Sequence, residues 1–153
     1  PWLVLLLIQI VPGISRYISA HFWGRWFDRA NFIVLRIVLN LLFGINMLLF
    51  FRDDLTVQFL AALCYGLGEG GGEIAWTLWV TKFSRPERTA EYMGVHVFLT
   101  GLRGVLAPQI VYSVLHPLGL RNITFVTLGL VLAACLMLLP LVPMGRRMAQ
   151  GNV

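Results

Sequence analysis

Charged side chains are scarce in this chain of 153 residues, where they make up 12% of the sequence. A water-soluble domain carries about 25% charged residues, because water has to solvate its surface. The apolar fraction is 58% and the mean hydropathy is +0.79. This shortage of charge excludes an ordinary soluble domain and indicates that lipid replaces water over most of the exterior.

Cysteine and metal-binding residues are also few. The two cysteines, Cys64 and Cys135, lie in apolar stretches, so a disulfide framework is excluded and small packing residues are predicted. The three histidines fall in separate segments without the spacing of a metal site. Residues 66–71 spell G-x-G-x-x-G, but no strand precedes them, so no dinucleotide site is predicted. We therefore expect no metal and no cofactor.

Basic residues exceed acidic residues by 12 to 7, a balance that in a soluble protein would raise the question of nucleic acid. Here the basic residues are spread between apolar stretches, and no nucleic-acid-binding motif accompanies them. Nucleic acid is therefore not expected as a partner, and membrane topology is the better explanation of the charge.

Long apolar stretches dominate the sequence and predict five membrane-spanning helices. The predicted spans are 2–23, 32–51, 55–81, 92–115 and 123–142. Each has roughly 20 or more residues, enough to cross a bilayer core of about 30 Å at 1.5 Å per residue. Helices are expected because backbone groups in lipid need hydrogen-bond partners within their own segment. The expected organisation is a transmembrane bundle over 1–145 and a short tail over 146–153.

The short connections between these segments predict the orientation. One side carries seven basic residues: Arg25, Arg29, Lys82, Arg85, Arg88, Arg146 and Arg147. The opposite side carries only Arg52 and Arg121. Because basic loops remain in the cytoplasm, the first side and the C-terminus are predicted to be cytoplasmic.

The first connection, 24–31, reads G-R-W-F-D-R-A-N. It resembles the G-x-x-x-D-[RK]-x-G-R-[RK] loop of the major facilitator superfamily of transporters. Gly24, Asp28 and Arg29 match, whereas Asn31 stands at the second glycine and apolar residues replace the basic pair. The resemblance implies that the glycine allows close helix approach and that the aspartate meets a helix N-terminus of the other half. It implies that the arginine pairs with acidic groups or lipid phosphates.

The resemblance implies an all-α membrane protein whose five helices form most of a six-helix half-bundle. The third segment lacks the arginine usual in the family's fourth helix, which favours the C-terminal half, approximately helices eight to twelve. The N-terminal half stays open, because Gly101 to Pro108 loosely echo the fifth helix of antiporters. A bacterial branch, the bacterial inner membrane and a missing N-terminal half as partner are implied, and the apolar start after Pro1 fits a chain that begins partway through a larger protein.

The implied function is secondary active transport of a small solute, coupled to protons or another ion, by alternating access. No enzymatic activity is expected. The alternatives are a non-transporting remnant or scaffold and, from another class, a membrane enzyme using Glu69, Glu73 and His96.

Four charged residues inside the predicted spans are candidates for the substrate or proton pathway: Glu69, Glu73, Arg103 and Arg16. A charge at mid-bilayer costs about 2.5–3.5 kcal/mol on insertion scales, so it usually faces a cavity or a partner. Two interpretations remain open, a cavity in which a glutamate carries a proton, and a structural Glu–Arg pair. Asn40 and Asn46, in the second span, could hydrogen-bond to another helix.

Small residues and proline in the spans are expected to permit close helix packing or bending. These are Gly66, Gly68, Gly70 and Gly72 in the third span, and Gly101, Gly104 and Pro108 in the fourth. Glycines four apart allow two helices to approach closely, and they also weaken a helix enough for it to bend. Both interpretations stay open.

Overall fold

The computed structural model describes residues 2–149, and the side chains within 2–145. This part of the chain is helical and contains no strand. The elements in order are α1 (Trp2–Leu5), η1 (Leu6–Ile10), α2 (Val11–Arg29), α3 (Phe32–Phe50), α4 (Leu55–Leu78), η2 (Trp79–Lys82), η3 (Pro86–Arg88), α5 (Thr89–Leu138), η4 (Leu139–Leu141) and α6 (Val142–Ala149). The all-α prediction is confirmed.

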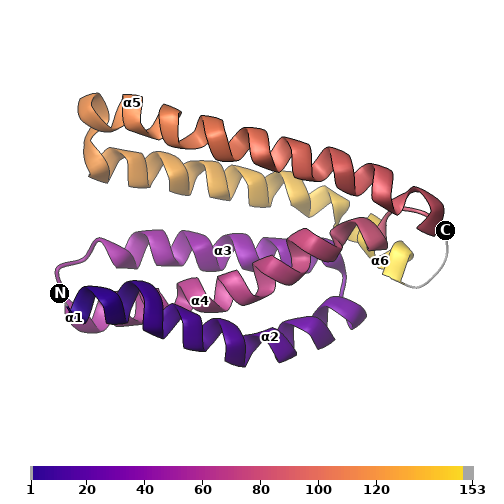
Figure 1. Ribbon diagram of the computed structural model, residues 1–153, viewed down its shortest axis with the longest axis horizontal. Coiled ribbons are helices and arrows are strands. Elements are labelled where there is room, and N and C mark those ends of the chain that lie inside the picture. The colour runs from indigo at the N-terminus through magenta and orange to yellow at the C-terminus, as the bar shows by residue number, and fades with distance from the viewer. Residues whose placement is uncertain (1, 150–153) are drawn as a thin grey trace.

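The first helical rod consists of α1, η1 and α2 without a break (Figure 1). It is longer than the predicted span 2–23, because the helix continues to Arg29 and ends where Ala30 adopts extended backbone, with φ −90° and ψ 161°. The residues from Gly24 to Arg29 therefore form the last turns of α2 and not the loop that we expected. Asn31 then caps α3 by accepting a hydrogen bond from the Ile33 amide at 2.9 Å.

Helix α4 packs against both α2 and α3. The core where the three helices meet is aromatic and aliphatic, and its buried members are Trp23, Phe27, Leu35, Leu39 and Ala75. Large side chains from α2 and α3 thus cover small residues of α4. This arrangement gives α4 a central position and fixes the walls of the site described below.

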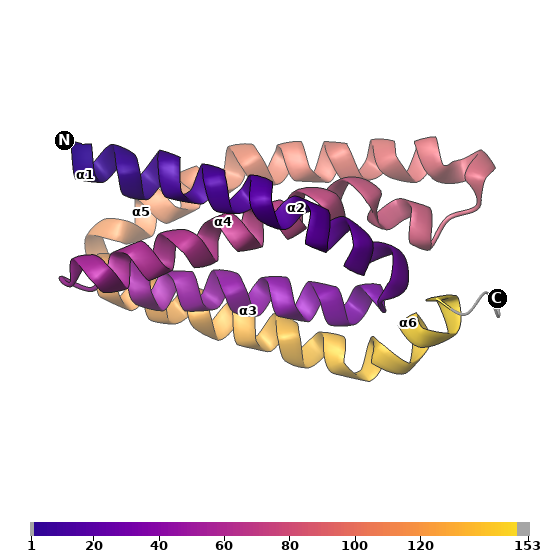
Figure 2. The ribbon, with the colours of Figure 1, turned by 90° about the horizontal axis from the view of Figure 1, so that it is seen from below.

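Helix α5 is folded back on itself at Gly119. That residue has φ 70° and ψ 158°, a backbone conformation that is essentially restricted to glycine. Figure 1 shows the two arms of α5, before and after this residue, running in opposite directions, and the view in Figure 2 shows that they lie well apart. The loop expected at 116–122 is thus reduced to one non-helical residue, because helical geometry continues through Pro117 and resumes at once after Gly119.

The two arms of α5 differ in how far they are covered. The second arm packs on α3, where Val131 and Leu128 lie beside Gly44 and the Cys135 thiol approaches the Ile37 carbonyl. The first arm is open along most of its length, and Phe98 and Tyr112 are 71% and 74% exposed. Within the described residues, little else of the chain covers this arm.

The connections gather at two ends of the molecule (Figure 2). The α2–α3 connection, η2, η3 and α6 lie at one end, here called the basic end. The N-terminal helix, the α3–α4 loop and Gly119 lie at the other. At the basic end Asn31 Nδ2 donates to the Val142 carbonyl at 2.6 Å, and Lys82 Nζ donates to the Asp28 carbonyl at 3.2 Å. The loops predicted to share one side of a membrane therefore lie together.

Within the described residues, three helices are long and apolar enough to cross a membrane: Trp2–Arg29, Phe32–Phe50 and Pro86–Gly145, the last of which includes both arms of α5. These helices are compatible with an integral membrane protein. Helix α4 is not among them, because glycines and two glutamates lower its hydropathy. The five-span half-bundle stays a prediction. Residues 150–153 of the predicted tail, and the side chains of Arg146 and Arg147, lie outside the described part.

Candidate functional site

The α2–α4 contact is made by small residues on both helices. A Cβ atom on Gly70 would lie 2.6 Å from Ser19 Oγ and 2.8 Å from the Arg16 carbonyl oxygen, and one on Gly66 would collide with Ser15. Ser15 Oγ donates to the Val11 carbonyl at 3.0 Å, and Ser19 Oγ donates to the Arg16 carbonyl at 3.1 Å, so both hydroxyls are satisfied within α2. Two helices can approach this closely only where side chains are minimal.

The remaining candidate small residues fall into two groups. A Cβ on Gly68 would meet the Phe43 ring of α3 at 3.3 Å, and one on Gly72 would meet the Trp76 ring at 3.0 Å. In contrast, nothing lies within 4 Å of a Cβ built on Gly101 or Gly104. Pro108 lies inside α5 on the same exposed arm. The glycines of α4 thus pack against neighbours, and those of α5 face open space.

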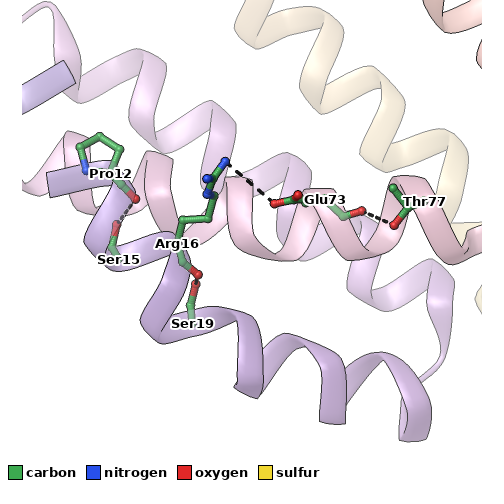
Figure 3. Close-up of polar contacts among 6 residues, drawn as sticks. All are labelled: Pro12, Ser15, Arg16, Ser19, Glu73 and Thr77. Carbon is green, nitrogen blue, oxygen red and sulfur yellow. Dashed lines mark hydrogen bonds and ion pairs between the residues drawn. The ribbon is translucent and has the colours of Figure 1, made fainter. Parts of the chain in front are cut away.

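Arg16 and Glu73 form an ion pair across the α2–α4 contact. Arg16 Nη1 lies 3.9 Å from Glu73 Oε2, and the two side chains are 40% and 67% exposed. Figure 3 shows the guanidinium of Arg16 reaching from α2 toward the carboxylate on α4. The Glu73 carbonyl also accepts a hydrogen bond from Thr77 Oγ1 at 2.6 Å. Two of the four candidate charges are therefore brought together, at an open edge of the bundle.

A groove of two adjoining cavities begins beside this ion pair. The larger cavity is about 410 Å³ and the smaller about 180 Å³. Both are lined by Ile8, Gln9, Pro12 and Tyr65; Leu7, Asn46, Phe50 and Ala62 complete the larger, and Gly13, Arg16 and Glu69 complete the smaller. We call this the Gln9–Glu69 groove. It offers a mostly apolar chamber joined to a charged one.

One polar group of the groove lacks a hydrogen-bond partner within the described residues, and another lacks an ion-pair partner there. The Oδ1 atom of Asn46 is buried and has no hydrogen-bond partner within the described residues, contrary to the expected bond to another helix. Glu69 takes part in no ion pair in that part of the chain, because Arg16 is joined to Glu73. A buried acceptor without a partner is costly unless a ligand or water satisfies it. These two groups are thus available to a bound molecule.

An irregular helical turn, η1, borders the same groove. Helix η1 is a π-helical turn, in which the amide of Val11 donates to the Leu6 carbonyl. Pro12 follows and has no N–H, so one carbonyl of the preceding turn loses its helical partner. Such π-turns occur frequently at functional sites. Gln9 belongs to this turn and lines both cavities.

Gln9 and Tyr65 were not predicted as site residues. The signal that was available is a lone glutamine in the otherwise apolar stretch 2–11, three residues before a proline. Tyr65 could have been found because it lies one helical turn before Glu69 and so shares its face.

Arg103, the fourth candidate charge, does not line the groove. It lies on the exposed arm of α5 and forms no ion pair among the residues whose side chains are described. Its charge repels that of Arg36 on α3, whose guanidinium lies 5.7 Å above the Trp76 ring. The predicted four-charge cavity is therefore represented by Arg16, Glu69 and Glu73 on one side of the bundle only.

The residues that carry the family resemblance lie at the basic end. A Cβ on Gly24 would meet nothing within 4 Å, and the side chains of Asp28 and Arg29 are exposed. Lys82 secures this end of α2, since its Nζ also lies 4.8 Å above the Phe27 ring. The three matching residues are thus presented outward, and the side chains of Asp28 and Arg29 form no hydrogen bond or ion pair within the described part.

Within the described residues, no group of three or more His, Cys, Asp or Glu side chains could hold a metal ion. Comparison with known proteins adds no relative: no family model, no curated protein and no solved structure matches the chain.

Proposed function

We propose that this chain is part of a secondary transporter of the major facilitator type, which moves a small solute by alternating access. The observation that supports this most is the Gln9–Glu69 groove, in which charged and polar groups border an apolar chamber between long apolar helices. Ligand sites are typically concave, mostly apolar and fitted with a few placed polar groups. The larger chamber, at about 410 Å³, has the size of a small-molecule site.

Glu69 is the proposed carrier of the coupling proton or ion. Its neighbour Glu73 is paired with Arg16, whereas Glu69 faces the groove without an ion-pair partner in the described part. Charged residues within membrane-spanning segments usually face a cavity or a partner and mark the pathways of ions and protons, so an unpaired carboxylate beside the groove is the proposed acceptor. Solute binding in the adjoining chamber would then change the surroundings of that carboxyl group and couple the two events.

The open first arm of α5 is the proposed contact with the rest of the transporter. Its exposed apolar side chains, Gly101, Gly104 and Arg103 would meet helices of the N-terminal half, and Asp28 would meet a helix end of that half at the basic end. In this proposal the basic end lies in the cytoplasm of a bacterial cell and the chain is embedded in the inner membrane, in accordance with the distribution of arginine and lysine.

A ligand screen tests the groove. Thermal unfolding of the purified full-length protein in mild detergent is measured with a panel of amines, carboxylates, sugars and nucleosides, since a bound ligand raises the melting temperature by mass action. We expect at least one solute to stabilise the wild type and to have a much smaller effect on Gln9→Leu. The matched control is Asn122→Leu, an exposed amide side chain that lines neither cavity of the groove, and it should keep the full effect. Equal stabilisation of both variants would exclude the groove as the binding site.

A further inference from the structure

A second cavity lies at the end of the bundle opposite the basic end. It has a volume of about 430 Å³ and lies between the end of α3 and the start of the second arm of α5. Its lining residues are Met47, Leu48, Phe51, Arg52, Leu120, Arg121, Thr124 and Phe125. We call this the Arg52–Arg121 cavity. It shares no residue with the Gln9–Glu69 groove, so it is independent of the proposed transport function.

Two arginines line this cavity, and neither is neutralised by an acidic side chain in the described part of the chain. The nearest acidic residues in sequence are Asp53 and Asp54. Asp54 Oδ1 accepts a hydrogen bond from the Val57 amide at 3.0 Å and so caps α4, while Asp53 is exposed and is not part of the cavity lining. The lining of the cavity therefore carries two positive charges and no negative one.

Local contacts fix the backbone at Arg52 and the side chain of Arg121. The Arg52 carbonyl accepts a hydrogen bond from Gln58 Nε2 at 2.7 Å, which ties the α3–α4 loop to the first turn of α4. The guanidinium of Arg121 lies 5.9 Å above the Phe125 ring. A guanidinium presents planar, paired donors that match the oxygens of a phosphate group, and stacking on an aromatic ring leaves those donors free at its edge.

The rest of the cavity wall is apolar and open. Leu48, Phe51, Leu120 and Phe125 are 40%, 46%, 50% and 54% exposed, and they continue from the arginines along α3 and α5. A free phosphate ion would gain nothing from these side chains. A molecule with an anionic head and a hydrocarbon chain would cover them.

The position along the helices also fits a lipid. Arg52 comes two residues after the end of α3, a helix apolar enough to cross a membrane, and Arg121 comes two residues after the reversal at Gly119. Both arginines are thus placed where this helix leaves the hydrocarbon region, which is the level of lipid phosphates.

We propose that the Arg52–Arg121 cavity binds one anionic phospholipid. Its phosphate lies between the two guanidinium groups, and an acyl chain runs along Met47, Leu48, Leu120 and Phe125 toward the middle of the bilayer. Such a lipid joins the end of α3 to the reversal of α5, and so holds the second arm of α5 against the bundle.

Thermal unfolding of the full-length protein in mild detergent tests the site. Three probes are compared: phosphatidylglycerol, phosphatidylcholine and inorganic phosphate. We expect phosphatidylglycerol to raise the melting temperature, and the other two to have little effect. In the double variant Arg52→Gln/Arg121→Gln, about tenfold more phosphatidylglycerol should be needed for the same shift, because each 1.4 kcal/mol of lost charge-assisted bonding is tenfold in affinity.

The matched control is Arg25→Gln/Arg85→Gln, which removes two exposed arginines at the basic end and should respond like the wild type. Equal responses of the two double variants, or equal stabilisation by phosphatidylcholine or inorganic phosphate, would overturn the proposal.

Photo-crosslinking of the wild type keeps the test independent of how the variants fold. A phosphatidylglycerol with a diazirine in its acyl chain should label peptides that contain residues 47–52 or 120–125. Labelling spread evenly over all exposed helices would show lipid solvation only, and would contradict a specific site.

Discussion

The guanidinium of Arg16 on α2 lies 3.9 Å from the carboxylate of Glu73 on α4, at the edge of a helix contact made by serines and glycines. The close approach of the two backbones brings these side chains together, and it leaves Glu69, one turn earlier on α4, facing the groove. The pair lies exposed where the groove begins. Because Arg16 pairs with Glu73, Glu69 is left without an ion-pair partner in the described part of the chain.

The ion pair should contribute little to stability. In a double-mutant cycle with Arg16→Gln and Glu73→Gln, the coupling free energy of unfolding is expected to be about 1 kcal/mol or less, because both side chains are substantially exposed. The reference is the exposed Arg88–Glu91 pair at 3.2 Å on one helical turn, which should give a similar value. A coupling of several kcal/mol for Arg16 and Glu73 alone would show that the pair is desolvated and structural.

Gly70 should tolerate no larger side chain. Gly70→Leu forces atoms into the Ser19 hydroxyl and the backbone of α2, and overpacking of this kind typically costs about 1–3 kcal/mol. The measurement is the free energy of unfolding in mixed detergent micelles. Gly129→Leu is the control, because a side chain there meets nothing within 4 Å. A Gly70→Leu protein as stable as the control variant would contradict the close α2–α4 contact at Gly70.

Gly119 should be required for the reversal of α5. Alanine at φ 70° and ψ 158° is strained, and we expect Gly119→Ala to lower the free energy of unfolding by about 1–3 kcal/mol. Gly129→Ala replaces a helical glycine in open space and should be neutral or stabilising by up to about 1 kcal/mol. A Gly119→Ala protein as stable as the wild type would contradict the folded-back arrangement.

Asn31 should stabilise the basic end through two hydrogen bonds of its side chain. Its Oδ1 caps α3, and its Nδ2 donates to the Val142 carbonyl. Asn31→Ala removes both bonds and should cost about 1–3 kcal/mol, whereas Asn31→Asp keeps the cap and loses only the bond to Val142, about 0.5–1.5 kcal/mol. Hydrogen exchange at the Ile33 amide separates the two, since only Asn31→Ala should accelerate it. Equal acceleration in both variants would show that Oδ1 is not the cap.

The helices could be predicted from the sequence because apolar length alone favours helix in lipid. The boundaries of the helices could not be predicted in this way. Residues from Gly24 to Arg29 look like a loop by composition, yet they are helical because Trp23 and Phe27 extend the core into them. The residues around Pro117 look like a connection, yet one glycine is enough to reverse the chain. Local composition does not reveal how distant segments pack, or that the single residue Gly119 adopts a positive φ.

The candidate site was predictable only in part. The four-residue spacing of Glu69 and Glu73 places them near each other on α4, but which of them would meet Arg16 depends on the offset between α2 and α4. That offset is set by the contact of Gly66 and Gly70 with α2. Gln9 enters the groove through a π-turn, which no simple hydrophobic period predicts. The place of Arg103 depends on the fold of α5.

The central claim, coupled transport through the Gln9–Glu69 groove, is tested most directly in proteoliposomes. The full-length protein is reconstituted, a stabilising solute from the ligand screen is applied as a gradient, and the internal pH and sodium concentration are followed with fluorescent indicators. The account predicts a solute-driven ion flux that is lost in Glu69→Gln and retained in Glu91→Gln, whose carboxylate pairs with Arg88 away from the groove. An undiminished flux in Glu69→Gln, or no solute-driven flux in the wild type, would contradict it.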